Sequence, residues 1–152
     1  MAGRETALQT AKAFVCDLDR FYQSEWAVFR FQKSHQDDLV LEIQEMMEKE
    51  YGSPITIEAM AEKACIGKRT LERRFKAATG DTPLKYLKRL RVEACKRMME
   101  TQNLTFEQIT HRVGYESSSY FRRVFTQICH ITPKAYRLKW GAAPAHLRSA
   151  HL

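Results

Sequence analysis

The strongest constraint on the fold of this 152-residue chain is an internal repeat. Three pairs of segments recur in the same order: residues 56–61 and 105–110 at an offset of 49, Leu71-x-Arg73-x-Phe75 and Phe121-x-Arg123-x-Phe125 at 50, and Thr82-Pro83-x-x-Tyr86 and Thr132-Pro133-x-x-Tyr136 at 50. The second copy therefore has one extra residue between Gly114 and Phe121, in a predicted turn where an insertion is tolerated. Chance would supply one such match but hardly three in order, so the chain contains two copies of one unit.

Each copy is predicted to form a helix, a tight turn and a second helix. In the first copy, Thr56 is the expected N-cap. Apolar residues then follow at helical spacing, at Ile57, Met60, Ala61 and Ala64 before a break at Gly67, and at Leu71, Phe75 and Ala78 before a stop at Gly80. In the second copy they are Phe106, Ile109 and Val113 before a break at Gly114, and Phe121, Phe125 and Ile128 after it. Two short amphipathic helices bury little surface alone, so each copy needs further helices.

Two longer amphipathic segments supply that support. Residues 36–51 form a predicted acidic helix that stops at Gly52, with Leu39, Ile43 and Met46 facing inward. Residues 83–100 form a predicted helix with Thr82 as N-cap, Pro83 at the first position, an apolar stripe of Leu84, Leu87, Ala94 and Met98, and an exit at Asn103. Its 18 residues span roughly 27 Å, comparable with the ~34 Å between successive major-groove faces of B-DNA. No strand is expected, so the predicted fold is all-α.

The charge of the chain is strongly polarised along its length. Residues 1–62 carry 6 basic and 12 acidic side chains, whereas residues 63–152 carry 19 and 6, so the net charges are −6 and +13. Such polarisation is typical of a surface that binds a polyanion, and by itself it does not distinguish DNA from RNA or an acidic membrane. No apolar run is long enough to span a bilayer, and the N-terminus lacks the apolar core of a signal peptide.

The second helix of the first copy carries the first candidate binding site. Leu71 and Phe75 are predicted to face the core, so the outer face consists of Lys68, Arg69, Glu72, Arg73 and Lys76. Arginine forks match the O6/N7 edge of guanine, and a glutamate can accept from cytosine N4. The alternative is a solvated charged face with a Glu72–Lys76 pair at i,i+4. The position after a turn and the downstream repeat favour DNA contact.

The equivalent helix of the second copy carries the second candidate site, made of Ser118, Ser119, Arg122 and Arg123. Small hydroxyl residues at a helix start leave backbone N–H groups free for a phosphate, and serine side chains reach phosphate or base. One serine, Ser117 or Ser118, is expected to be the N-cap. Arg123 is equivalent to Arg73, which makes it the first candidate for a base contact.

Metal binding and catalysis find little support in the sequence. The cysteines (Cys16, Cys65, Cys95, Cys129) are widely spaced and are expected to be reduced thiols, with Cys65 and Cys129 packed as small hydrophobes. His111 and His130 lack the close spacing of a structural zinc site. No phosphate loop, nucleophile elbow or H-E-x-x-H motif is present, so neither a cofactor nor an enzymatic activity is expected.

Residues 36–140 resemble the DNA-binding domain of the AraC/XylS family of bacterial transcription regulators. The motifs that carry the resemblance are Ala61-x-x-Ala64-Cys65-x-x-x-Arg69-x-Leu71-x-Arg73-x-Phe75, then Ile109-x-x-x-Val113-Gly114-Tyr115-x-x-x-Ser119-x-Phe121-x-Arg123-x-Phe125, and finally Thr132-Pro133-x-x-Tyr136-Arg137. The resemblance implies about seven helices: a first helix-turn-helix subdomain (36–82), a long central helix (83–100) and a second subdomain (101–140).

The same resemblance implies how the domain binds DNA. The second helix of each motif would enter adjacent major grooves, with Arg69, Glu72 and Arg73 reading one half-site and Ser118, Ser119, Arg122 and Arg123 contacting the other. Two departures from the family pattern stand out. Gly67 replaces the usual serine N-cap, and His130 replaces a glycine that corresponds to Gly80. If the second site requires a positive φ, histidine is tolerated there at a cost in strain.

Residues 1–35 resemble the last helix and linker of those regulators that carry an N-terminal glutamine-amidotransferase-like sensor domain, on the segments 11–14, 19–20 and 23–26. This implies a sensor domain before residue 1, through which the protein would dimerise. Residues 141–152 are expected to form a flexible tail. The implied partners are double-stranded DNA and RNA polymerase, without a membrane, and the implied location is the cytoplasm, at the nucleoid when bound to DNA.

Two alternatives belong to other classes of protein. A non-specific basic nucleic-acid-binding protein accounts for the +13 half but not for two matched turns and recognition helices. A thiol- or metal-sensing module would have to use the dispersed cysteines and histidines. Affinity for random against selected duplex, and a thiol titration with elemental analysis, distinguish these alternatives from a sequence-specific regulator.

Overall fold

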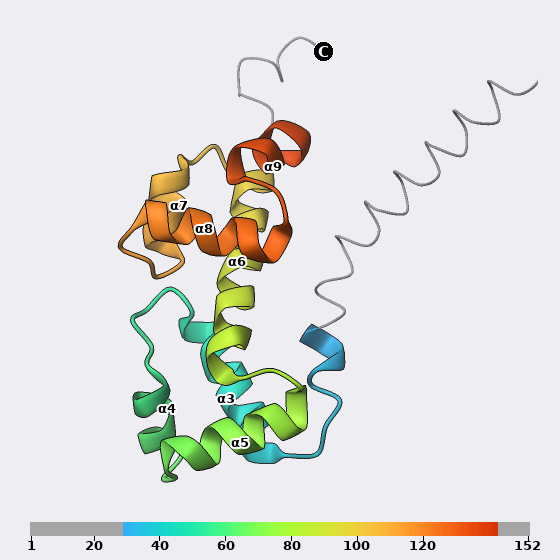
Figure 1. Ribbon diagram of the computed structural model, residues 1–152, viewed down its shortest axis with the longest axis vertical. Coiled ribbons are helices and arrows are strands. Elements are labelled where there is room, and N and C mark those ends of the chain that lie inside the picture. The colour runs from blue at the N-terminus through green and yellow to red at the C-terminus, as the bar shows by residue number, and fades with distance from the viewer. Residues whose placement is uncertain (1–28, 143–152) are drawn as a thin grey trace, which may run out of the picture. The chain divides into compact units, whose positions relative to one another are not determined.

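The computed structural model describes residues 29–142, which belong to two separate units with a boundary between Gln36 and Asp37. Of the first unit, residues 29–36 are described, and residues 29–31 are helical. In the second unit, the described residues 37–142 fold into seven helices, α3 to α9, with no strand among them (Figure 1). The all-α prediction is therefore confirmed for this unit. The expectations for the linker segments before residue 29 and for the C-terminal tail lie outside the described residues.

Helix α3 (Asp38–Glu50) opens the unit, and its buried face differs from the predicted one. Asp37 caps the helix by accepting from the Val40 N–H. The buried residues are Val40, Ile43, Gln44 and Met47, whereas Leu39 and Met46 are only half-buried. Two of the three predicted positions, Leu39 and Met46, are off by one residue, and the predicted stripe did not include Gln44. Its amide is buried because it hydrogen-bonds the side chain of Tyr86, and such a partner makes the burial of a polar group affordable.

The first helix-turn-helix consists of α4 (Ile57–Lys63) and α5 (Lys68–Thr79), and the second of α7 (Phe106–Arg112) and α8 (Ser118–Cys129). Thr56 and Thr105 cap α4 and α7 in the same way, each accepting from the backbone N–H three residues on. The anchors Leu71, Phe75, Phe121 and Phe125 are fully buried. The predicted repeat of two helix-turn-helix units is confirmed.

The turn of the first copy is built on Cys65 and not on Gly67. Cys65 has φ +53, and the equivalent Gly114 has φ +84. Their backbone N–H groups make equivalent bonds, to the carbonyl oxygens of Glu62 (3.0 Å) and His111 (3.1 Å). Gly67 does lie in the break between α4 and α5, as predicted, but with φ −71 it is the N-cap of α5 and not the left-handed residue of the turn. Cys65 is exposed and does not pack in the core as predicted, because the left-handed turn directs it outward.

The second helices of both motifs, α5 and α8, end on a second pair of left-handed residues. Gly80 caps α5 with φ 82, and His130 caps α8 with φ 59. Each cap N–H donates to the carbonyl four residues earlier, at 2.9 Å in both copies. The expected positive φ at His130 is therefore confirmed, and the two copies keep one backbone conformation with glycine and non-glycine residues exchanged.

Each copy is closed by a helix that starts with Thr-Pro: α6 (Pro83–Thr101) for the first and α9 (Pro133–Trp140) for the second. The ring of Tyr86 meets Phe75 edge-on at 5.4 Å between centroids, and Tyr136 meets Phe125 in the same way at 5.7 Å. Both tyrosine hydroxyls then donate to a glutamate, Glu48 of α3 and Glu100 of α6. Helix α6 therefore closes the first copy as α9 closes the second, and opens the second copy as α3 opens the first.

This double role explains why the predicted stripe on α6 is partly wrong. Leu84 is 51 % exposed, although Leu87 and Ala94 are buried as expected. The structure instead buries residues on several sides of the helix, among them Tyr86, Leu90, Val92, Cys95 and Met99. A helix that packs against two cores is apolar on more than one face, so a single 3.6-residue stripe does not describe it.

The two subdomains meet at a tight junction around Arg91 of α6, which is 8 % exposed. Its guanidinium donates to the carbonyl oxygens of Tyr51 (2.8 Å) and Ser53 (2.9 Å), in the loop after α3, and lies 5.0 Å above the ring centre of Tyr115. A Cβ atom on Gly114 would lie 2.9 Å from both Arg91 Nη2 and the Tyr51 oxygen. The turn of the second copy therefore needs glycine at this point both for its φ and for its close packing.

Candidate nucleic-acid interface

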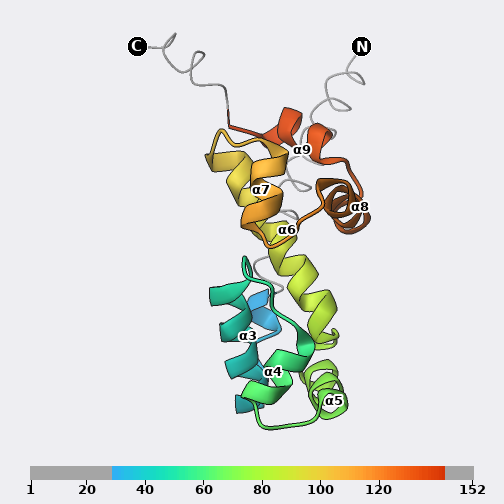
Figure 2. The same ribbon diagram turned by 90° about the vertical axis from the view of Figure 1, so that its left-hand side faces the viewer.

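The second helices of the two motifs lie on the same side of the unit. In Figure 1, α5 and α8 both run across the long axis of the drawing, at different heights along α6. Figure 2 shows both nearly end-on at the same edge, so their axes run in similar directions. Helix α6 holds them apart, because α5 and α8 each pack against it. The arrangement presents two helices side by side with a fixed separation.

On α5, the exposed face carries three basic side chains. Arg69, Arg73 and Lys76 are exposed, whereas the core anchors Leu71 and Phe75 lie on the opposite face. Because successive residues are about 100° apart around a helix, Arg69, Arg73 and Lys76 fall within one outward sector. Glu72 lies at the border of that sector and is half-buried. Four of the five residues predicted for this helix therefore share the outward face or its edge.

Lys68 is the member of the predicted set that faces elsewhere. Its ammonium group lies 2.6 Å from Glu58 Oε1 on α4. The hydrogen bond from Lys68 lowers the pKa of Glu58, and the bond to Glu58 raises the pKa of Lys68. Both groups are exposed to solvent, so the pair adds little stability. It does hold the Lys68 side chain beside α4, away from the outward sector of α5.

Arg74, the fifth basic residue of α5, joins the helix to the start of α3. Its Nε and Nη2 atoms donate to the two carboxylate oxygens of Asp37, at 3.0 and 2.6 Å. This bond to Asp37 raises the pKa of the guanidinium. A fork-to-fork pair fixes direction as well as charge. Arg74 therefore positions α5 and is not part of the outward face.

Of the four residues predicted on α8, Ser119, Arg122 and Arg123 are exposed, and Ser118 is half-buried. Ser117 is the N-cap, accepting from the Tyr120 N–H at 3.2 Å, so one of the two serines proposed for this role is identified. Gly67 at the same place on α5 offers no side-chain cap. Arg123 points outward like Arg73, whereas Arg122 lies on the flank of α8, 5.6 Å from the ring centre of Phe106.

The structure adds one residue that sequence analysis missed. Tyr120 is 42 % exposed on the other flank of α8, with the Arg123 guanidinium 5.9 Å from its ring centre. An exposed aromatic ring beside an outward-facing arginine can contact a thymine methyl group. The sequence could have indicated this exposure, because Tyr120 directly precedes the core residue Phe121 and therefore points about 100° away from the buried face.

Between residues 29 and 142, no three histidine, cysteine or acidic side chains come together as a metal-binding group. Among the same residues, no helix has both the length and the apolar character needed to cross a membrane.

Comparison with known proteins agrees with this geometry. The model of a family described as a helix-turn-helix domain matches residues 60–139. An AraC-like transcription regulator of Streptomyces lividans is 38% identical over 82 residues, which are 54% of this chain and 27% of that protein. The transcriptional activator RhaR of Cronobacter sakazakii is 36% identical over 77 residues, 51% of this chain and 27% of RhaR. The chain thus spans about a quarter of the length of these relatives.

A solved structure supports the same assignment. The DNA-binding domain of AdpA, a global transcriptional factor crystallised with a target DNA, has a TM-score of 0.64 and 28% identity, over 66% of this chain and 91% of the AdpA chain. The fold and the outward faces of α5 and α8 define a tandem helix-turn-helix protein. The chain belongs to the helix-turn-helix domain family matched here, and the relatives that it resembles include an AraC-like transcription regulator.

Proposed function

We propose that this chain recognises a specific duplex DNA sequence by placing α5 and α8 in successive major grooves on one side of the helix. The observation that carries the proposal is the placement of two equivalent recognition helices on one side of α6 (Figures 1 and 2). Helix α6 has 19 residues and is about 28 Å long, which approaches the ~34 Å between successive major-groove faces. A modest bend of the DNA would bring both grooves onto the two helices.

Base readout is assigned to the outward residues of the two helices. Arg73 and Arg123 occupy equivalent outward positions, and an arginine fork pairs with guanine O6 and N7. Arg69 and Lys76 flank Arg73 and meet bases or phosphates in the first half-site, with Glu72 available to a cytosine amino group. Ser118 and Ser119 serve the second half-site, and Lys68 is left with a phosphate contact at most.

The relatives favour regulation of transcription as the purpose of this binding. AdpA binds a target DNA, and RhaR is a transcriptional activator. By analogy, the intact protein would act at the bacterial chromosome in the cytoplasm, contact RNA polymerase and dimerise through a further domain. These relatives are regulators and not enzymes, and we propose no catalytic step for this chain.

The proposal is tested by selecting the best duplex from a random pool and measuring two variants on its single-base variants. Arg73→Ala and Arg123→Ala are each expected to cost about 1–3 kcal/mol on the selected duplex and to relax base preference at one position. Lys88→Ala is the control, because Lys88 lies on α6 outside both reading helices. Equal losses on every duplex would contradict the recognition-helix assignment and leave a non-specific basic binder.

The salt dependence of binding tests the electrostatic part of the same proposal. With both motifs docked, about 6–10 phosphate contacts are expected, hence a log–log slope of affinity against salt of roughly −5 to −9. A slope near zero would rule out binding to DNA of the kind proposed.

A further inference from the structure

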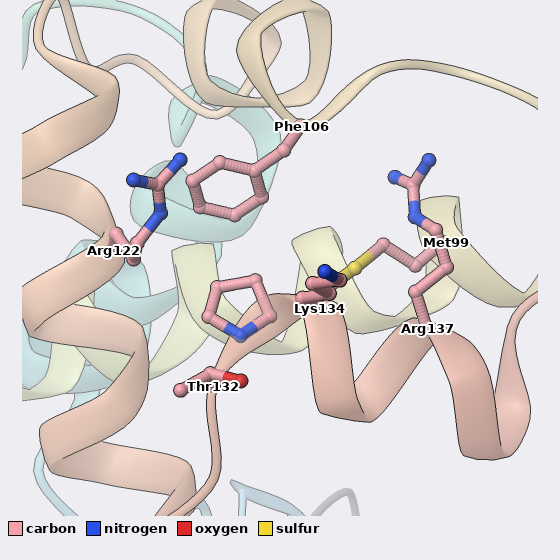
Figure 3. A pocket seen from close by; sticks show the side chains of 7 residues that line it. Met99, Phe106, Arg122, Thr132, Lys134 and Arg137 are labelled. Carbon is pink, nitrogen blue, oxygen red and sulfur yellow. The ribbon is translucent and has the colours of Figure 1, made fainter.

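A cleft in the second subdomain is lined by several positively charged side chains. It has a volume of about 570 Å³ and is open to solvent. Its lining residues, which we call the cationic cleft, are Met99, Phe106, Arg122, Thr132, Pro133, Lys134 and Arg137. Figure 3 shows Arg122 and Arg137 on opposite sides of the cleft, with Phe106 and Lys134 between them. Three of the seven residues are cations and none is acidic, so the cleft fits an anion.

One of these cations is incompletely satisfied. The Nη2 atom of Arg137 is buried, and within the described part of the chain it has no hydrogen-bond partner. Because this nitrogen is closed off from solvent, the Arg137 guanidinium contributes positive charge to the wall of the cleft and not a direct contact with a large ligand. Arg122 and Lys134 are exposed at the rim, where an anion can reach them.

The internal repeat allows a comparison, because the first subdomain has the same fold without the three positive charges of the cleft. At an offset of 50, Arg122 corresponds to Glu72, Lys134 to Leu84, and Arg137 to Leu87. Leu84 is 51 % exposed and Leu87 is buried, so neither position requires a charged residue for folding. The three cations are therefore an addition to the second copy, and a requirement of the shared fold does not explain them.

We propose that the cationic cleft binds a backbone phosphate of the duplex at the edge of the groove that α8 enters. This inference rests on the proposed function, since it takes α8 to lie in a major groove. Arg122 directly precedes the reading residue Arg123 and lies about 100° from it around the helix, so it faces the groove wall, where the phosphates run. Phe106 and Pro133 supply an apolar surface for the deoxyribose next to that phosphate.

The proposal makes the two half-sites unequal in how they hold DNA. The second subdomain anchors the sugar-phosphate strand through Arg122 and Lys134, with the charge of Arg137 behind them, whereas Glu72 and Leu84 give the first subdomain no such anchor. The second half-site is therefore expected to be bound with higher affinity and with less dependence on its base sequence.

The test combines a protein variant with a neutral DNA linkage. Lys134→Ala is expected to weaken binding to the selected duplex and to its single-base variants by the same factor, and to make the salt slope shallower by about 0.9. Lys139→Ala is the matched control. It removes the same charge from the same helix, but Lys139 lies outside the cleft, with its ammonium 4.4 Å from the ring centre of Trp140.

Single methylphosphonate linkages then locate the phosphate. One or two positions in the second half-site are expected to weaken the wild-type protein but not Lys134→Ala, and no position in the first half-site is expected to show this coupling. Absence of coupling at every position overturns the proposal. Binding of inorganic phosphate near Lys134 without DNA, together with absent coupling, would instead show a site for a free anion. In either case, a changed base preference of Arg123→Ala would leave the proposed function standing.

Discussion

The Nε atom of Arg91 donates to the backbone carbonyl oxygen of Tyr51 at 2.8 Å, across the boundary between the two subdomains. Arg91 belongs to the middle of α6, and Tyr51 ends the first helix of the first copy. The Tyr115 ring of the second copy lies against the same guanidinium. One side chain thus ties the loop of one subdomain to the turn of the other.

We expect Arg91→Ala to destabilise the unit and to loosen the spacing between the reading helices. The two part-buried hydrogen bonds from the guanidinium to the carbonyl oxygens of Tyr51 and Ser53 would be lost, at a cost of about 1–3 kcal/mol in total. Urea unfolding measures that loss. Duplexes with the half-sites moved apart or together by one base pair measure the second effect, since the variant should discriminate between them less than the wild type.

Lys88→Ala is the control for both measurements, because Lys88 lies on the same helix and is only half-buried. An Arg91→Ala protein that keeps the wild-type preference for spacing would show that the junction does not set the separation of the helices.

The paired aromatic anchors should each support one subdomain. Phe75 and Phe125 are fully buried, and Phe→Ala at such a site costs about 3–5 kcal/mol. Hydrogen exchange is expected to show the largest loss of protection in α4–α5 for Phe75→Ala and in α7–α8 for Phe125→Ala. Leu138→Ala is the control, since Leu138 is 82 % exposed. Equal loss of protection in both subdomains for either variant would mean that they unfold only together.

The three turn and cap glycines should respond differently to a side chain. Gly80→Ala is expected to cost about 1–2 kcal/mol, because φ is +82 while nothing lies within 4 Å of the new Cβ. Gly114→Ala should cost more, since its Cβ would also meet Arg91 and the Tyr51 carbonyl. Thermal or urea unfolding ranks the variants, and equal costs would show that packing at Gly114 is unimportant.

Gly67→Ser, by contrast, should increase the stability of the folded unit. Gly67 caps α5 at φ −71 without a side-chain bond, and a serine there can accept from the start of the helix. We expect a gain of about 0.3–1 kcal/mol, from the cap and from a less flexible unfolded chain. A loss of stability on the same unfolding curve would contradict the assignment of Gly67 as a simple N-cap.

The thiols should differ sharply in reactivity. Cys65 is exposed, whereas Cys95 and Cys129 are buried, and burial raises the pKa of the Cys95 thiol far above its ordinary value. Less thiolate at a given pH means slower attack on a disulfide reagent. In a Cys16→Ser background, one thiol is expected to react quickly near pH 8 and two only after unfolding. Rapid reaction of all three would contradict the packing around α6.

The sequence repeat predicted much of this fold, because each copy offers an independent reading of the same backbone. Thr56 and Thr105, or Gly80 and His130, confirm one another as caps even where one partner alone is ambiguous. The features that could not be predicted depend on contacts between helices or on an unusual residue in a turn. The left-handed residue Cys65 was not predicted because glycine, present two residues later, is the residue that usually adopts a positive φ. The buried Gln44 was hidden because its partner, Tyr86, lies on another helix.

The candidate site was likewise predicted where helical periodicity decides and not where contacts between helices decide. Leu71 and Phe75 fixed which side of α5 faces inward, so Arg69 and Arg73 could be assigned to the outward face by periodicity alone. The pairing of Lys68 with Glu58 could not be predicted, since it depends on how α4 and α5 cross. The cationic cleft was likewise invisible, because its members come from four helices and from the loop before α9.

Because α6 closes one copy and opens the next, the folded unit is longer than the repeat that encodes it. Four helices from Asp38 to Thr101 complete the first copy, yet the sequence repeats after only 49 or 50 residues. A fragment cut at the repeat boundary would leave one copy without a wall of its core. The smallest pieces that retain all four helices of a copy, residues 37–101 and 82–142, overlap along the whole of α6. A chain of this design would therefore lengthen by three helices per added copy. Helix α9 would then open the added copy, as α6 opens the second.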